Sequence, residues 1–519
     1  MARSLKTVKR KTVKRKMVKK ENALVTALTQ PQIKMTFTEN LAPTNASSGS
    51  AMLDYFALGG ALRSRDEASI NALFAKAFAE NRLLATKCAF YFRDIRGGGQ
   101  GERRSFRSVL RWLAERYPKV VEKNLENVPF FGRWDDLFVL FGTPVEDEMV
   151  SLIASQLKSD MSALKKDREK AQVSILGKWM PSENTSSSAT RALAYKFIHA
   201  LSLSKKNYRK TLSALRKQIA VVERAMCSGD WTSIDYERVP SNAAMRYRKA
   251  FSKHDALRYV AFLGEVAGGK KEIKATTLYP YDIIDKVRCG QHDATLELQW
   301  KALPDYLAEK PHNGLCVVDV SGSMMGKRHN QSVEPMSVSL SLGLYFAERI
   351  QGAFNGYFIT FSGQPTFLKV KGSTLHEKLR NMSMQAGTNT NLQAVFDLIL
   401  GKAVREKIPQ SEMPDVIYIV TDTEFDHPQN HGIEKTNFQV IEEKYEAAGY
   451  SMPILVWWNV DSRHNQVAAT INDKNTLLVS GLSASVFKHV LTGKEEVKIT
   501  PLEQMNKVLL SERYERVVV

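Results

Sequence analysis

The segment Val317–Met324 constrains most strongly what this chain can fold into. Apolar residues run without a break from Leu315 to Val318, and the polar loop Asp319-x-Ser321-x-Ser323 follows directly. A strand that is apolar at successive positions is buried on both faces, which is typical of a parallel sheet covered by helices. Ligands of such sheets bind where the strands end. The segment therefore predicts an α/β sheet with a polar site at its carboxyl edge.

The chain after Trp300 alternates apolar strands with helices. We expect strands at 314–320, 355–361, 366–371, 415–421, 453–459 and 476–480, and helices at about 333–351, 374–384, 391–406, 436–448, 484–492 and 501–511. This alternation is typical of a doubly wound, Rossmann-like α/β domain. We place that domain at residues 301–519.

Three segments are expected to bring oxygen-bearing side chains to one edge of the predicted sheet. The first strand is followed by Asp319, Ser321 and Ser323, Thr388 lies just before a helix, and Asp422 follows the strand at 415–421. Hard divalent cations bind oxygen ligands, and a set with only two charged members suits Mg²⁺ or Mn²⁺ with some waters retained. We therefore predict a metal site that consists of these five residues.

These motifs resemble the von Willebrand factor A domain with its metal-ion-dependent adhesion site. The family motif D-x-S-x-S is matched in full, its Thr corresponds to Thr388 and its second Asp to Asp422. The resemblance implies that the hydroxyls of Ser321, Ser323 and sometimes Thr388 touch the metal, that the aspartates often act through water, and that a partner's carboxylate completes the octahedron. Thr423 departs from the family, because many members have Gly after the second Asp.

An Asp-first loop also raises an enzyme alternative, a phosphatase of the haloacid dehalogenase type. Such an enzyme needs a general acid two residues after its nucleophilic Asp, and Ser321 occupies that place here. A phosphate-binding P-loop is not present at Gly97–Glu102, because no Gly-Lys-Ser/Thr follows. We expect the protein not to be an enzyme, and a metal-dependent hydrolase is the lowest-ranked alternative.

Residues 51–300 show helical periodicity almost throughout. Apolar residues such as Leu73, Phe74, Ala77 and Phe78 recur at intervals of three and four. Helices of roughly 10–20 residues separated by short polar breaks are typical of stacked helix pairs. We therefore predict an α-helical, HEAT-like repeat array over 51–300, in front of the α/β domain.

The basic charge of the chain is unevenly distributed. The net charge is +19, and residues 1–20 contain ten Lys or Arg and no acid, in an approximate five-residue repeat. The valines of this repeat match neither the helical nor the strand period, so we predict that residues 1–50 form a disordered basic tail and linker. Such a run binds nucleic-acid phosphates, provides a nuclear or organellar address, or simply keeps a protein soluble.

Composition further restricts the setting in which the protein works. No apolar run is long enough to cross a bilayer, and the N-terminus lacks the apolar stretch of a secretory signal. The four cysteines are scattered, without the spacing of a zinc site or a disulfide framework. We expect an intracellular, cytoplasmic protein with no membrane partner, and a nuclear location is the alternative that the basic tail suggests.

Cationic residues in the helical region predict contacts with RNA. The glycine-rich turn Gly97–Gly101 lies just before a helix, where it would hold a phosphate or simply form a tight turn with solvated arginines. Further on, Tyr208 and Tyr247 are interleaved with cations, which suits stacking on unpaired bases but is equally compatible with tyrosines that pack inward. The residues predicted to contact RNA are Arg93, Arg96, Arg103, Arg104, Arg107, Lys205, Lys206, Arg246 and Arg248.

A helical array followed by an A-type domain resembles the Ro ribonucleoprotein (TROVE-type) family. The segments YFRDIRGGGQGERRSFR, KWMPS, RKTLSALRKQIAVVE, YRKAFSKHD and LYPYDI resemble more closely a little-characterised, Ro-related family of A-domain proteins. In Ro proteins a helical ring closed by the A domain binds small non-coding RNAs outside and single-stranded RNA ends in its hole. The resemblance implies a non-enzymatic RNA-binding scaffold. The alternative is a protein-interaction module that captures an acidic partner residue through the metal site.

Overall fold

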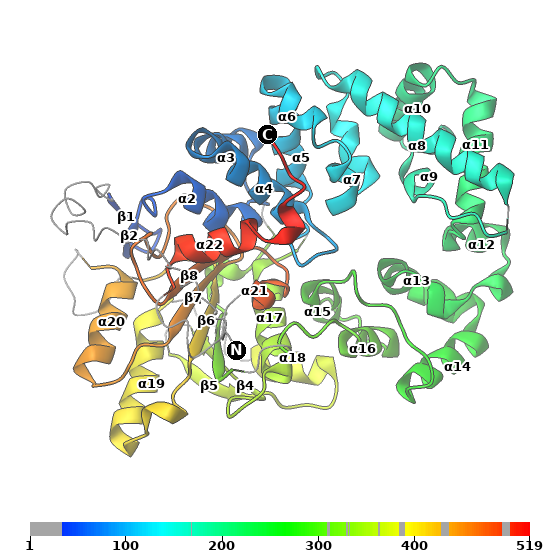
Figure 1. Cartoon of the computed structure of the whole chain (residues 1–519). Coiled ribbons are helices and arrows are strands. Elements are labelled where there is room, and N and C mark those ends of the chain that lie inside the picture. Colours follow the sequence, from blue (N-terminus) through cyan, green and yellow to red (C-terminus); the bar gives the residue numbers. More distant parts are fainter. Residues whose placement is uncertain are drawn as a thin grey trace, which may run out of the picture.

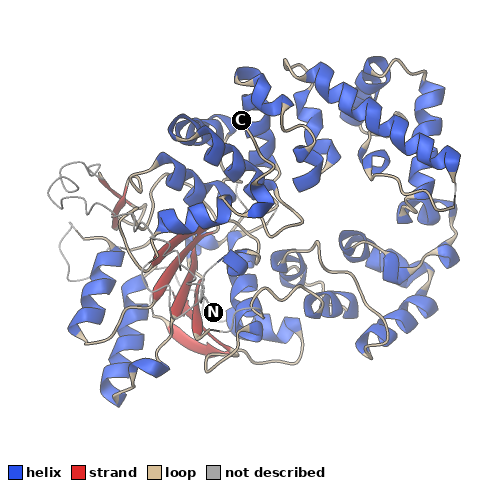
Figure 2. Cartoon of the chain, viewed as in Figure 1, coloured by secondary structure: helices blue, strands red, loops and turns tan. Residues whose placement is uncertain are grey.

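The computed structural model describes residues 34–167, 169–308, 312–327, 331, 333–361, 364–383, 390–426, 435–489 and 499–519. The predicted basic tail at 1–20 and the predicted metal ligand Thr388 lie outside these residues. Helices extend to one side of the molecule, and the strands gather on the other side (Figure 2). The protein therefore consists of a helical region and an α/β unit.

Six strands form one sheet in the order β5-β4-β3-β6-β7-β8. Their bounds are β3 (Gly314–Asp319), β4 (Tyr357–Phe361), β5 (Thr366–Lys369), β6 (Val416–Thr421), β7 (Ile454–Asn459) and β8 (Thr476–Ser480). All neighbours are parallel except β4 and β5, which are antiparallel. The chain leaves β3 toward β4 and β5 and then crosses back to β6, so the strand order reverses between β3 and β6. Doubly wound sheets bind their ligands at this kind of reversal.

Helices cover both faces of this sheet. They are α17 (Pro335–Arg349), α18 (Leu375–Ser383), α19 (Leu392–Glu406), α20 (Asn437–Ala447), α21 (Val486–His489) and α22 (Pro501–Leu509). Because successive side chains of a strand point to opposite faces, Leu315 and Val317 belong to the core shared with α19, α20 and α22. Cys316 and Val318 belong to the core shared with α17, α18 and α21. This explains why the strand is apolar at every position, and it confirms the predicted α/β arrangement.

The helical region contains fifteen α-helices among the described residues. They are α2 (Ala51–Leu58), α3 (Glu67–Glu80), α4 (Arg82–Arg93), α5 (Arg104–Arg116), α6 (Pro118–Glu122), α7 (Asn127–Phe131), α8 (Glu146–Lys166), α9 (Leu176–Trp179), α10 (Ser188–Ala200), α11 (Lys205–Gln218), α12 (Val222–Ser228), α13 (Ser241–His254), α14 (Ala256–Ala267), α15 (Pro280–Arg288) and α16 (Ala294–Lys301). No helix in the described part of the chain is both long and apolar enough to cross a membrane.

The helical region leaves the sheet and returns to it. In Figure 1 the helices run outward from α2 to α8, turn at α10–α12 and come back through α13–α16. The outgoing end packs α2 against β8, and the returning end packs α15 against α17. The two ends also meet directly, because Arg63 Nη2 donates to the hydroxyl of Tyr281 at 3.3 Å. The helices and the α/β unit therefore form a closed circuit.

Residues 34–50, for which the sequence predicts a linker, are instead packed against the α/β unit. β1 (Met35–Phe37) and β2 (Pro43–Asn45) form a small antiparallel hairpin. Asn45 N–H donates to the carbonyl of Val467 at 3.3 Å, and Val467 N–H donates back at 3.0 Å. The linker prediction rested on local composition, which does not register contacts to residues so distant in sequence. We call residues 34–46 the N-terminal strap.

Candidate metal centre

The loop after β3 holds three of the five predicted metal ligands. The carboxylate of Asp319 is fully buried; its Oδ1 accepts the N–H of Ser321 at 2.9 Å and its Oδ2 the hydroxyl of Thr421 at 2.6 Å. The hydroxyls of Ser321 and Ser323 lie 3.0 Å apart. Helix α17 fixes the start of the loop, because Ser339 Oγ donates to the Asp319 carbonyl at 2.9 Å. The loop thus gathers one carboxylate and two hydroxyls at the end of β3.

The loop after β6 supplies the second carboxylate. Asp422 is 1% exposed, and its Oδ1 accepts the N–H of Glu424 at 3.3 Å. Between them Thr423 has a φ of 68°, in the left-handed region that a β-branched residue rarely adopts. Its neighbours hold it there: Thr423 N–H donates to Thr421 Oγ1 at 3.0 Å. A glycine would adopt this φ without strain. Strained backbone of this kind clusters at functional sites.

The two carboxylates influence each other electrostatically. Burial raises the pKa of Asp319, and the nearby charge of Asp422 raises it further. Hydrogen bonds from Ser321 and Thr421 lower it but do not outweigh these effects. Two buried carboxylates on either side of the strand reversal need positive charge to be stable in their ionised forms.

A hard divalent cation fits this donor set. The available atoms are carboxylate and hydroxyl oxygens, which Mg²⁺ and Mn²⁺ prefer. Among the described residues no group of three His, Cys, Asp or Glu side chains could hold a metal ion, so a cation here would also need the serine hydroxyls. Thr388 falls outside the described segments. Thr390, two positions later, is buried and donates its N–H to Asp426 Oδ2 at 2.7 Å.

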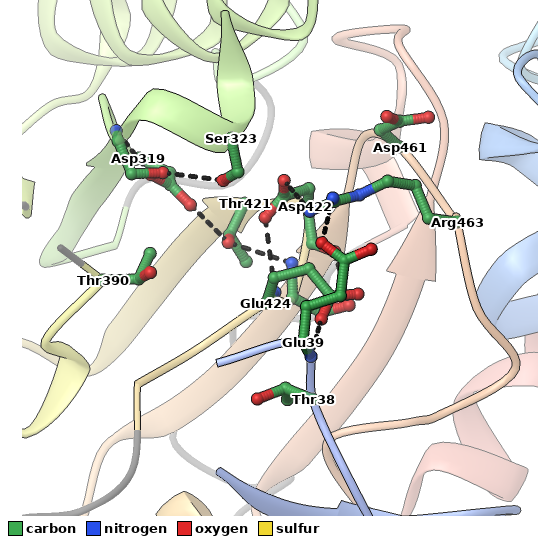
Figure 3. A network of polar contacts seen from close by, with 12 residues as sticks. Thr38, Glu39, Asp319, Ser323, Thr390, Thr421, Asp422, Glu424, Asp461 and Arg463 are labelled. Carbon is green, nitrogen blue, oxygen red and sulfur yellow. Dashed lines mark hydrogen bonds and ion pairs between the residues drawn. The ribbon is translucent and has the colours of Figure 1, made fainter. Parts of the chain in front are cut away.

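Arg463 is a component of the site that sequence reasoning missed. Its guanidinium reaches from the loop after β7 to two carboxylates, with Nη2 2.6 Å from Asp422 Oδ2 and Nη1 2.5 Å from Glu39 Oε2 (Figure 3). Burial alone would lower the pKa of Arg463, but the carboxylates of Asp422, Glu424 and Glu39 outweigh it and raise this pKa. No local motif connects residues 39, 422 and 463, so only the tertiary structure reveals the contact.

A cavity of about 550 Å³ lies beside Arg463, between the start of α3 and the loop after β7. Arg65 lies in its wall and bonds to that loop: Nε donates to the Ser462 carbonyl at 2.7 Å and Nη1 to Asn465 Oδ1 at 2.6 Å. The lining residues are Ser64, Arg65, Asp66, Ser69, Arg463, His464 and Asn465. The cavity therefore borders Arg463, and none of the described candidate metal ligands lines it.

Several arginines predicted to contact RNA have structural roles instead. Arg93 is 2% exposed and its Nε donates to Asp136 Oδ2 at 2.7 Å. Arg248 is 4% exposed and its Nε donates to Asp293 Oδ2 at 2.6 Å. A side chain this deeply buried cannot reach an RNA, which corrects the expectation for Arg93 and Arg248. The charge of a residue in the sequence does not reveal its burial in the fold.

Three more of the predicted arginines are bonded within the protein. Arg96 Nη1 donates to the carbonyls of Pro129 and Phe130, and Arg104 Nη1 donates to the carbonyl of Arg65. Arg107 pairs with Asp135 and Asp136, in both cases at 2.7 Å. These contacts hold the loop 94–103 and the start of α5 in place.

The glycine-rich turn lies at the junction of the two regions. Ser485 Oγ donates to the carbonyl of Gly99 at 2.9 Å, so the turn is bonded to the loop after β8. A Cβ at Gly97 would lie 1.6 Å from Arg513 Nε, and a Cβ at Gly101 would lie 1.7 Å from the hydroxyl of Tyr279. Close approach of neighbouring side chains therefore accounts for these glycines. Of the two interpretations that the sequence left open, the structure favours the tight turn.

The other four predicted RNA-contact residues, Arg103, Lys205, Lys206 and Arg246, are exposed. Tyr208 points inward and its hydroxyl donates to the Pro181 carbonyl at 2.8 Å, so it does not present its ring to solvent. Tyr195 on α10 is 43% exposed, and Lys205 Nζ lies 4.6 Å from the centroid of its ring. The sequence pattern indicates Tyr208, but the exposed aromatic ring beside Lys205 is that of Tyr195.

Two family models match the chain. The model described as Domain of unknown function (DUF2828) matches residues 38–150 and 144–312, and the model described as Domain of unknown function (DUF7788) matches residues 313–515. The two matches meet directly before β3. Neither description states an activity.

Individual proteins are similar as well. An uncharacterized protein of Acanthamoeba polyphaga mimivirus is 28% identical over 515 residues, which cover 92% of this chain and 87% of that protein. The crystal structure of the Ro (RSR) protein of Deinococcus radiodurans aligns over 89% of this chain and 99% of that chain, with a TM-score of 0.35 and 13% identity. At that score the likeness carries no argument about function.

Proposed function

This chain belongs to the family described as Domain of unknown function (DUF2828), and we propose that it is a non-enzymatic scaffold whose divalent-cation centre captures an acidic group of a partner. The cation is Mg²⁺ or Mn²⁺, bound by Asp319, Ser321, Ser323 and Asp422, with Thr388 as a fifth ligand. In this proposal the α/β unit is a von Willebrand factor A domain with a metal-ion-dependent adhesion site.

One observation carries the proposal: two buried carboxylates lie on either side of the strand reversal, with two hydroxyls beside them. Asp319 is the last residue of β3 and Asp422 directly follows β6, so both lie at the carboxyl edge where ligands of doubly wound sheets bind. A site with few charged ligands leaves the cation electrophilic toward a further carboxylate. The partner's acidic side chain would supply that carboxylate.

The same geometry favours binding over catalysis. Ser321 stands where a phosphatase of this loop type would need its general acid. Its N–H donates to Asp319 and so shapes the loop, and its hydroxyl lies 3.0 Å from that of Ser323, where it can bind a cation. Asp319 in turn accepts two hydrogen bonds and is fully buried, which suits a residue that anchors a cation rather than one that attacks a substrate.

The proposal is tested by titrating Mn²⁺ into the wild-type protein and into Ser321→Ala by isothermal titration calorimetry. We expect one Mn²⁺ per chain and at least about a 10-fold weaker affinity in the variant, because a direct ligand is removed. Ser341→Ala is the matched control, since Ser341 is also a buried serine but donates to the Val338 carbonyl within α17. Equal Mn²⁺ affinity in the wild type and Ser321→Ala would rule out the site.

RNA binding is a second candidate function, favoured by a specific patch. The net charge is +19, and the patch on α10 and α11 exposes Tyr195, Lys205, Lys206 and Lys210. An exposed aromatic ring beside lysines suits stacking on an unpaired base while the cations contact phosphates. This patch lies far along the helical region from the sheet in Figure 1, so the two functions do not exclude each other.

The RNA candidate is tested with a labelled 15-nucleotide oligouridine by fluorescence anisotropy over a salt series. The double variant Lys205→Ala/Lys206→Ala should bind the oligouridine more weakly. The negative slope of log K, where K is the association constant, against log salt should become shallower by about 0.7 for each phosphate that the variant no longer neutralises. Lys402→Ala/Lys435→Ala removes the same charge from the α/β unit and serves as the control. Identical slopes for the two double variants would show that the patch does not bind RNA.

A further inference from the structure

The N-terminal strap lies directly against the loops of the candidate metal centre. Thr38 Oγ1 donates to the Phe425 carbonyl at 2.7 Å, and Glu39 N–H donates to Glu424 Oε2 at 2.8 Å. Asn40 Nδ2 donates to the Glu424 carbonyl at 2.9 Å and to Thr390 Oγ1 at 3.1 Å. The strap thus joins the loop that carries Asp422 to the segment that follows Thr388.

The carboxylate of Glu39 is held on this surface by two basic side chains. Its Oε2 lies 2.5 Å from Arg463 Nη1, and its Oε1 lies 2.8 Å from His464 Nε2. The other Nη of Arg463 lies 2.6 Å from Asp422 Oδ2. One guanidinium therefore bridges a carboxylate of the strap and a carboxylate of the proposed metal centre, as Figure 3 shows.

Arg463 opposes a divalent cation at Asp422 in two ways. Its side chain is 10% exposed, so its positive charge acts on its neighbours with little screening by water. It also holds one oxygen of Asp422 that a cation or its water shell would otherwise use. Among the described residues the Nε of Arg463 is buried without a hydrogen-bond partner. The carboxylates at its two Nη groups compensate its charge together with that of Glu424.

We infer that Glu39 sets the metal affinity of the site by neutralising Arg463 next to Asp422, so that docking of the strap and binding of the cation favour each other. This inference rests on the proposed metal site and adds its regulation. With the strap docked, Glu39 and Asp422 share the guanidinium, so less of its positive charge opposes a cation at Asp422. Without the Glu39 charge, less negative charge compensates Arg463, and the guanidinium opposes a cation at Asp422 more strongly. Such a coupling is reciprocal, so the cation also stabilises the docked strap.

The first test compares Mn²⁺ affinity in Glu39→Gln and the wild type by isothermal titration calorimetry. We expect the variant to bind on the order of 10-fold more weakly, within the usual range of coupling between sites. Gln keeps the backbone N–H that donates to Glu424, so the strap retains that anchor. Glu443→Gln is the control, because Glu443 is 48% exposed against 47% for Glu39 and also pairs with a cation, Lys435. Equal affinity in Glu39→Gln and the wild type overturns the inference.

The double variant Glu39→Gln/Arg463→Gln tests whether Glu39 acts on Mn²⁺ binding through Arg463. Removing Arg463 removes the competitor, so Arg463→Gln should bind Mn²⁺ at least as tightly as the wild type, and adding Glu39→Gln should change nothing further. If Glu39→Gln weakens Mn²⁺ binding equally in both backgrounds, the route through Arg463 is wrong.

Amide hydrogen exchange gives a reading that needs no variant. Backbone amides of residues 35–45 should exchange more slowly in Mn²⁺ than in EDTA, and exchange rates that Mn²⁺ leaves unchanged overturn the coupling. If Ser321→Ala weakens Mn²⁺ binding but Glu39→Gln does not, this inference is wrong and the metal site stands. A wild type that binds no Mn²⁺ overturns the metal site, and the inference with it.

Discussion

Buried carboxylates hold several arginines of the helical region in structural ion pairs. Asp136 is fully buried and accepts hydrogen bonds from Arg93 Nε and Arg107 Nε, each at 2.7 Å, and from the N–H of Arg133 at 2.9 Å. Among the described residues, the ion pair of Arg93 is the one with Asp136. A guanidinium that is removed from water in this way is tolerated only while its partner is present.

Asp136→Ala tests this dependence. We expect the variant to lose about 3–5 kcal/mol of unfolding free energy, because Arg93 remains buried with an uncompensated charge. The measurement is the urea midpoint and slope, followed by circular dichroism.

Asp397→Ala is the control for that experiment. Asp397 also pairs with a cation, Lys444, but it is 59% exposed, so its removal should cost at most about 1 kcal/mol. Similar decreases in stability in the two variants would mean that burial does not set the value of the Arg93 contact.

The packing of α17 on β3 positions the loop of the candidate site. Gly343 faces Val318, and a Cβ at this glycine would lie 2.3 Å from Val318 Cγ2. This close approach allows Ser339, one helical turn earlier, to reach the Asp319 carbonyl. The geometry at the end of β3 therefore depends on a helix that has no side chain at its point of closest contact.

Gly343→Ala should move α17 away from the sheet. The helix gains about 1 kcal/mol from the better helix former, but the overpacked contact costs about 1–3 kcal/mol. Gly264→Ala, in the last turn of α14, makes the same substitution with no atom within 4 Å of its new Cβ. We therefore expect Gly343→Ala to be less stable than Gly264→Ala by about 1–3 kcal/mol in urea unfolding, and Mn²⁺ affinity to fall only in Gly343→Ala. A Gly343→Ala protein as stable as Gly264→Ala would contradict the packing argument.

The two regions of the molecule are interlocked rather than joined end to end. Gly60 N–H donates to Ser480 Oγ at 2.9 Å, so the start of the helical region is bonded to the end of β8. Near the C-terminus Arg513 Nε lies 2.5 Å from Asp94 Oδ2, which bonds the end of the chain to the helical region. The strap likewise bonds the N-terminal part of the described chain to the α/β unit. The helical region and the α/β unit are consequently bonded to each other at several separate places.

The sequence by itself determined the secondary structure of the α/β unit and three parts of its candidate site. Apolar runs and helical periodicity are local signals, so the strands from β3 to β8 and the loop at Asp319, Ser321 and Ser323 could be predicted from them. Asp422 could be placed at the same edge because parallel strands end together. The strands of the strap have only three residues each, which is too short for a reliable periodic signal, and the composition around them predicted a linker.

Only the tertiary structure decided the strand order, the docking of the strap, and the burial of individual charges. Arg463 meets Asp422 and Glu39 because three loops converge in space, and no periodicity in the chain encodes a contact over 424 positions. The same limit applies to Arg93 and Arg248, whose charge was visible in the sequence but whose burial was not. Whether an arginine binds an RNA or stabilises a core depends on how much water its neighbours exclude, and that is a property of the packed molecule.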